Sequence, residues 1–209
     1  MTPSALLAIV RQEFNETSSQ DSFVSDIEIY NYLSEGEMKL ADHTNCTEKT
    51  DATTTTVAST ADYAKITDTM NIIRVTWDGV PLSKITLEEA TQMFGVSYGG
   101  SAPEGNPTSY VEFGANVTLY PTPDSAETLK FWYVYEPPLL ASTSTAFSVP
   151  TQFEYFLKDF ALMRMYYKDE DAQIGDKHLA LWENNLQVAR RQWDERENWG
   201  REEKVLIVE

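Results

Sequence analysis

The chain has few of the residues that build catalytic or metal centres. Its 209 residues include a single cysteine, Cys46, and only two histidines, His43 and His178. One cysteine can form neither an internal disulfide nor a zinc site of the cysteine type. The sequence also lacks a His-x-x-x-His pair, a nucleophile elbow and a glycine-rich phosphate loop. These absences predict a protein without metal, cofactor or enzymatic activity.

Acidic residues near one helix break resemble a calcium loop only in part. Counting from Asp169, the sixth position is Ile174 where such a loop has glycine, and the twelfth is Ala180 where it has glutamate. An acidic chain always offers carboxylate pairs for glycoside hydrolysis, but nothing in this sequence singles out one pair. A small acidic hydrolase is therefore only a distant third interpretation.

Positive charge is also scarce. The chain has 33 acidic and 16 basic residues, a net charge of −17, and the acidic excess is spread along its whole length. An acidic surface repels phosphate, which argues against tight nucleic-acid binding. Two interpretations remain open: an ordinary soluble acidic surface, or a wall along which DNA slides without sticking.

Long apolar runs are absent as well. No stretch approaches the roughly 20 apolar residues of a membrane-spanning helix. The first ten residues lack the basic start of a signal peptide, and charged Arg11 and Glu13 follow soon after. We therefore expect no membrane association and synthesis in a cytoplasm.

Helical patterns occupy both ends of the chain. Near the N-terminus, apolar spacing predicts helices over 4–15 and from Ser25 to about His43, the second with Glu28 completing a capping box. Near the C-terminus, Val149-Pro150-Thr151 opens a third helix, and a fourth is expected from about Ala172 to Asn198. Its seam alternates three and four residues, which indicates helix-on-helix packing: Leu179, Trp182, Leu186, Ala189 and Trp193.

Strand patterns fill the middle of the chain. The threonine-rich stretch 45–62 favours extended chain, with a disordered linker as the alternative. Asp78-Gly79 predicts a type I′ hairpin turn, and Thr86 with Glu89 predicts a capped short helix. A β-meander then follows from Tyr110 to about Glu136, and both faces of its last strand are apolar enough to be covered.

These patterns predict an α+β fold with three parts. Residues 1–45 and 150–199 should form a helical bundle, and residues 46–149 an inserted antiparallel β-domain resembling a sandwich or barrel. Residues 200–209 should form an extended tail. This tail contains four consecutive apolar residues with no partner in the preceding helix, which makes them a candidate site for docking on another protein chain: Val205, Leu206, Ile207 and Val208.

The order of these motifs resembles the head-to-tail adaptor (connector) proteins of tailed bacteriophages. The likeness rests on a Trp-Asp-Gly-x-x-Leu hairpin from Trp77 to Leu82, a meander from Tyr110 to Asp124 that ends in Pro-x-Pro-Asp, and the Val-Pro helix opening, with helix pairs on both sides. It covers residues 1–197, and its specificity comes from the order of short motifs. None of these motifs is catalytic.

The resemblance implies a structural virion protein made in the host cytoplasm. Such adaptors form a ring, here expected to have twelve copies, that binds the portal protein at the head-tail interface and extends the DNA channel. Their C-terminal tail often reaches into the portal, so the resemblance makes the apolar residues Val205 to Val208 the candidate contact with the portal or a neighbouring subunit. DNA passes through without specific binding, and the ring offers a docking platform for tail proteins of the nozzle, tube or fibre. The main alternative is a β-sandwich carbohydrate- or receptor-binding module of a phage tail.

Overall fold

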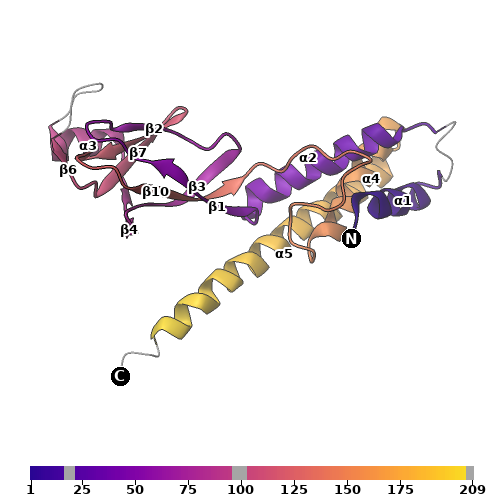
Figure 1. Cartoon of the computed structure of the whole chain (residues 1–209). Helices are drawn as coiled ribbons and strands as arrows, with labels where there is room; N and C mark the ends of the chain where they lie inside the picture. The colour runs from indigo at the N-terminus through magenta and orange to yellow at the C-terminus, as the bar shows by residue number, and fades with distance from the viewer. Residues whose placement is uncertain (17–21, 96–102, 206–209) are drawn as a thin grey trace. The chain divides into compact units, whose positions relative to one another are not determined.

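A computed structural model describes residues 1–16, 22–95 and 103–205, with only the backbone described over 197–205. The chain divides into two compact units (Figure 1). We call residues 1–47 with 136–209 the helical unit, and residues 48–135 the β-unit. The predicted α+β class is confirmed. Segment 136–149 belongs to the helical unit instead of the β-domain, because three of its side chains lie in the helical core: Leu140, Phe147 and Val149.

The helices of the helical unit surround one hydrophobic core. Residues from α2, α4 and α5 supply most of it, and the largest fully buried side chains include Phe153 and Phe160. Helix α5 packs along α4, and α2 packs against both. The elements are α1 (Pro3–Glu13), α2 (Asp26–Thr44), the short η1 (Glu154–Phe156), α4 (Leu157–Lys168) and α5 (Ala172–Val205).

Helix α2 begins as its sequence predicts. The Ser25 side chain accepts a hydrogen bond from the Glu28 amide, and the Glu28 carboxylate accepts one from the Ser25 amide, so the capping box is present. Val24 and Ile29 are both fully buried in the core, as expected for a hydrophobic staple. Ile27 lies on the solvent side of the helix with 73% of its surface exposed, whereas Ile29 and Tyr30 are buried in the core.

The predicted seam of α5 faces α4. Trp182 is buried and meets the Phe160 ring edge-on, with ring centroids 5.1 Å apart. Trp193 is also buried and meets Phe153 at 6.5 Å. Helix α5 runs further than expected, since it passes through Gly200 and reaches Val205. Residues 200–205 are therefore helical and not an extended tail; one glycine costs a helix only about 1 kcal/mol relative to alanine.

The β-unit contains two four-stranded sheets and a two-stranded one. The strand orders are β1-β10-β3-β4, β2-β8-β7-β5 and β6-β9, and over the described residues neither larger sheet closes into a barrel. Two pairings are parallel, β5 with β7 and β6 with β9. The prediction of a purely antiparallel β-domain was therefore wrong for these two short pairs. The bounds are β1 (Glu48–Thr55), β2 (Asp62–Ala64), β3 (Thr69–Trp77), β4 (Val80–Pro81), β5 (Ser83–Lys84), β6 (Glu104–Gly105), β7 (Ser109–Phe113), β8 (Asn116–Tyr120), β9 (Thr122–Pro123) and β10 (Thr128–Tyr135).

Both larger sheets contribute to one apolar core in the β-unit. Strand β10 turns Leu129, Phe131 and Tyr133 into this core, where they meet residues of β7 and β8. Its opposite face is less covered than predicted, because Lys130 and Trp132 are only half-buried there. The core residues are Tyr63, Ile72, Val75, Trp77, Leu82, Tyr110, Val117, Leu119, Leu129, Phe131 and Tyr133.

Local turn chemistry in the β-unit matches its sequence. Asp78 and Gly79 both have positive φ, 47° and 76°, as the predicted type I′ turn between β3 and β4 requires. Thr86 caps α3 (Leu87–Phe94), which ends at Gly95 in the left-handed conformation. Within the threonine-rich stretch 45–62, residues 48–55 form the exposed strand β1, which pairs with β10. The prediction of an extended chain is confirmed there, and the alternative of a disordered linker is not.

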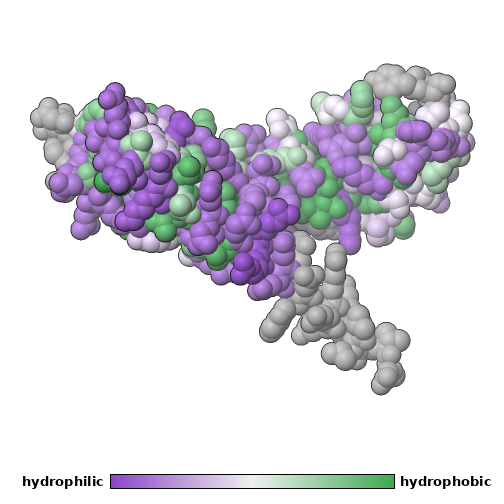
Figure 2. All heavy atoms as spheres, turned by 180° about the vertical axis from the view of Figure 1, so that it is seen from behind, coloured by the Kyte–Doolittle hydropathy of each residue, from purple (hydrophilic) through white to green (hydrophobic). Residues whose placement is uncertain are grey.

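The visible surface is mainly hydrophilic (Figure 2). Hydrophilic residues cover most of the face seen in Figure 2, and the hydrophobic residues there occur as separated patches. Within the described residues no helix is long and apolar enough to cross a membrane.

Candidate interaction surface

The predicted docking segment lies at the far end of α5. Val205 is the last residue of that helix, while Leu206, Ile207 and Val208 lie outside the described residues. Val205 is therefore helical, where an extended conformation was expected. Binding of the portal or a neighbour by these four residues stays a prediction.

Helix α5 extends past the core of the helical unit. Its 34 residues span about 51 Å at the usual helical rise. Among side chains that the structure describes, Trp193 is the last one on α5 that belongs to the core. Figure 1 shows the helix continuing beyond the other helices of its unit. Asp194, Glu195 and Arg196 are exposed and are therefore available for contacts other than core packing.

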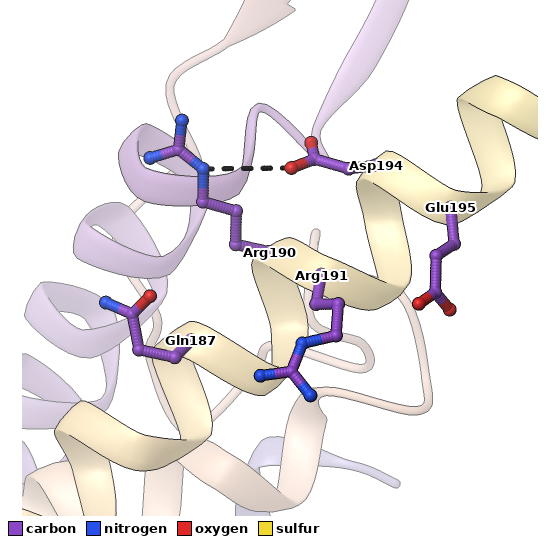
Figure 3. Close-up of a pocket in the computed structure, with 5 residues that line it drawn as sticks. All are labelled: Gln187, Arg190, Arg191, Asp194 and Glu195. Atoms are coloured by element: carbon purple, nitrogen blue, oxygen red, sulfur yellow. Dashed lines mark ion pairs between the residues drawn. The ribbon is translucent and has the colours of Figure 1, made fainter.

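A shallow hollow lies on α5 just before this extension (Figure 3). It has a volume of about 280 Å³, and all of its described lining comes from one helix, so it is an open depression. Arg190 Nε lies 3.8 Å from Asp194 Oδ2, but both side chains are more than half exposed, which makes this ion pair weak. Arg191 has no ion-pair partner among the described side chains. The lining residues are Gln187, Arg190, Arg191, Asp194 and Glu195.

The chemistry of the hollow suits contact with a charged protein surface. It brings together two guanidinium groups, two carboxylates and an amide, all on the solvent side of α5. None of these five residues is a serine, cysteine or histidine that could act as nucleophile or base near neutral pH. Arginine is frequent at protein interfaces, because its planar donors pair with carboxylates in a fixed geometry.

Two polar residues of α2 hold the segment that returns from the β-unit to the helices. Ser34 Oγ accepts a hydrogen bond from the Leu140 amide at 2.8 Å and donates one to the Tyr30 carbonyl at 2.8 Å. Glu37 Oε1 accepts from the amides of Ser148 and Val149, the latter at 3.1 Å. Both ends of segment 140–149 are thereby attached to one face of α2.

The Glu37 carboxyl is an unusual anchor. It is fully buried, and its second oxygen, Oε2, has no hydrogen-bond partner among the described residues. Burial raises the pKa of Glu37; the two backbone amides act in the opposite direction, and the nearby Glu154 carboxylate raises it further. Folding therefore favours the neutral carboxyl more than the unfolded chain does. Sequence reasoning missed Ser34 and Glu37 because polar residues are normally assigned to exposed helix faces.

Glycine at position 36 supports the same anchor. A Cβ atom there would lie 3.1 Å from the Phe160 ring, so only glycine lets α4 approach α2 this closely without a shift. Ser34, Gly36 and Glu37 share one buried face of α2 with Leu33 and Leu40. This mixture of a glycine and polar residues at core spacing was the available sequence signal.

The sequence matches the SU10 adaptor protein family over residues 1–204. The chain belongs to the SU10 adaptor protein family. The protein is therefore an adaptor-type structural protein of a bacteriophage, and the resemblance proposed from its motifs is confirmed at that level. Membership in a family of structural adaptors implies a non-enzymatic role in the virion. Comparison with curated proteins gives no match.

The two histidines of this SU10 adaptor family member pack within the helical unit. His178 Nδ1 lies 3.1 Å from Asp159 Oδ1, and its ring stacks on Tyr166 with centroids 5.6 Å apart. His43 Nε2 is buried without a hydrogen-bond partner in the described part of the chain. That part contains no group of three or more histidine, cysteine, aspartate or glutamate residues that could hold a metal ion.

Proposed function

We propose that this protein is a head-to-tail adaptor that binds the portal protein as a ring of twelve copies. The ring extends the DNA channel below the portal and offers a docking platform for nozzle, tube or fibre proteins of the tail. Membership in the SU10 adaptor protein family carries the proposal. The element order agrees with it, since helices at both ends of the chain flank an inserted β-unit.

In this proposal the helical unit acts as a bundle and the β-unit as a sandwich. Two observations support that description. Residues from α1, α2, α4 and α5 share one core, and residues from both four-stranded sheets share another. A helix pair alone would leave its apolar stripe exposed, so each unit needs its full set of elements.

The proposed ring has an acidic lumen through which DNA passes without specific binding. The net charge of −17 supports this arrangement, because every phosphate neutralised by the wall would add drag that depends on salt. A gel shift with the isolated protein at low salt tests it. We expect no retardation of duplex DNA at micromolar protein; retardation there would contradict the acidic-channel proposal.

The proposed anchor to the portal or the neighbouring subunit is the C-terminal segment Val205, Leu206, Ile207 and Val208. Its position after a long helix that has already left the core supports this role. Deleting residues 201–209 should leave the melting temperature of the protein within about 2 °C of wild type and abolish attachment to portals. Unfolding of the truncated protein, or full decoration of portals by it, would show that the segment is not the anchor.

Ring formation on the portal is the decisive experiment. Purified protein is mixed with purified portal, and mass photometry counts the copies bound to each portal. We expect one saturated species carrying a closed ring, with electron microscopy showing it in line with the portal channel. A mixture in which no copies bind, or in which the protein binds a polysaccharide instead of the portal, would overturn the proposed function.

A further inference from the structure

Positive charge in the β-unit gathers at one place. The unit contains five lysine and arginine residues. Lys49 pairs with Asp68 at 3.1 Å, while Lys65 and Lys84 both pair with Glu112, at 2.5 and 2.6 Å. The two remaining cations, Arg74 and Lys130, have no carboxylate partner within the described residues.

Both of these cations lie beside Trp132. Strand pairing places Arg74 of β3 directly opposite Trp132 of β10, and Thr50 of β1 opposite it on the other side. Residues opposite one another in antiparallel strands share a face of the sheet. Lys130 lies two residues earlier on that face, with its Nζ 4.5 Å from the centre of the Trp132 ring. The face therefore presents an indole between a guanidinium and an ammonium group.

This face points away from the core of the β-unit. The neighbours Phe131 and Tyr133 are buried between the sheets, whereas Trp132 and Lys130 are half-buried and Arg74 is exposed. We call Thr50, Arg74, Lys130 and Trp132 the Trp132 patch. Tryptophan and arginine are the residue types that most often dominate the binding energy of protein interfaces.

We propose that the Trp132 patch binds the acidic surface of a second copy of this chain. The proposal rests on the ring assembly proposed above and names one of its contacts. Copies with a charge of −17 repel one another, and a surface that offers cations reduces this repulsion where two copies meet. In the β-unit those unpaired cations lie at this patch, and the neighbouring copy offers carboxylates almost everywhere else.

A contact of this kind would be heterologous. The patch of one copy meets a different, acidic surface on the next, and such contacts close into rings when the rotation between copies allows it. The indole would lose its remaining exposure to water, while Arg74 and Lys130 would exchange water for carboxylates. Two cations are too few for strong binding to DNA in a chain with this net charge.

The test compares two variants that change the net charge equally. Arg74→Glu reverses charge in the patch; Lys177→Glu does so at an exposed residue of α5 that makes no ion pair in the described structure. Each variant is mixed with portal, and mass photometry gives the distribution of bound copies. We expect Lys177→Glu to form complete rings like wild type. Arg74→Glu should leave partly filled rings and raise the concentration for half-assembly about tenfold or more.

Folding and the two proposals are checked separately. Circular dichroism verifies that each variant is folded. Trp132→Thr is a second substitution that disrupts the Trp132 patch without changing the charge. Complete rings with both Arg74→Glu and Trp132→Thr would overturn the inference and leave the adaptor function standing. Failure of wild type to bind portal would instead overturn the adaptor function. Loss of every bound copy in Arg74→Glu would assign the patch to the portal, also against the inference.

Discussion

The helical unit buries charged residues, whereas the β-unit buries only uncharged ones among the residues described. Four acidic or basic residues are buried in the helical unit: Arg11, Glu37, Glu154 and Asp159. The buried polar residues of the β-unit are all hydroxylic: Thr56, Thr76, Ser109 and Thr122. A buried charge needs partners and depends on pH, while a hydroxyl finds a backbone partner and does not titrate. The stability of the two units should therefore respond differently to pH and to mutation.

Arg11 illustrates the partners that a buried charge requires. Its guanidinium is almost fully buried, donates to Asp26 Oδ1 at 2.8 Å and to the Val24 carbonyl at 2.9 Å, and pairs with Glu16 at 3.2 Å. Thr56 is a buried polar residue of the β-unit that satisfies its hydrogen bonds through one uncharged hydroxyl. Its hydroxyl bonds backbone atoms of Glu127 and receives the indole N–H of Trp77 at 3.1 Å.

The largest expected effect is in the apolar core of the helical unit. Trp182→Ala should lower the free energy of unfolding by about 3–5 kcal/mol, because it empties a large buried site against Phe160. Denaturant unfolding followed by circular dichroism measures this change. The control is Leu181→Ala at the adjacent exposed position, expected to change it by less than about 1 kcal/mol. Equal effects of the two variants would contradict the observed register of α5.

A smaller effect is expected in the β-unit, at the N-terminal cap of α3. The Thr86 side chain accepts from the Glu89 amide, and the Glu89 carboxylate accepts from the Thr86 amide at 2.7 Å. Thr86→Ala should cost about 1 kcal/mol of unfolding free energy, with no dependence on pH between 6 and 9. Thr91→Ala, on the exposed side of the same helix, is the matched control. A loss as large as that of Trp182→Ala would mean that α3 has a wider role.

The smallest effect at a fixed pH, and the most informative one, concerns Glu37. Its pKa is raised in the folded protein, so folding favours the protonated form, and stability falls as pH rises from the ordinary glutamate range toward the folded value. Glu37→Gln keeps an oxygen for the Ser148 and Val149 amides and removes the titration. Its unfolding free energy should therefore depend less on pH than that of wild type.

Chemical denaturation at several pH values measures this difference. Glu183→Gln, at an exposed site on α5, removes a carboxyl of the same type and should keep the wild-type pH dependence. Identical pH profiles for Glu37→Gln and wild type would show that Glu37 titrates no differently in the folded and unfolded chain.

Much of the β-unit could be predicted because its turns are specified by a few neighbouring residues. Asp78-Gly79 and the Thr86 capping box each act over two to four positions, and both were found where expected. The pairing of strands distant in sequence could not be predicted. The parallel pairs β5–β7 and β6–β9 depend on tertiary packing and leave no local pattern.

In the helical unit the sequence predicted the apolar seams and missed what lies between them. Trp182 and Trp193 were found from their spacing. Glu37 and Ser34 were missed because their burial depends on the return segment 140–149, which no helix pattern describes. The end of α5 was predicted too early because Gly200 was taken as the end of the helix. A single glycine does not interrupt this long helix, which continues to Val205. The Trp132 patch was missed because Trp132 was assigned to a covered face.

The pairing of β1 with β10 has a further consequence. Glu48, the first residue of the β-unit, is paired with Val134, one residue before its last, and paired residues lie about 5 Å apart. The inserted unit thus begins and ends at almost the same point. A module with adjoining ends can be exchanged, enlarged or replaced by a short linker without moving the ends of its host. We therefore expect relatives to differ more in this module than in the helices. The helical unit should also fold by itself when a few residues join Thr47 directly to Glu136.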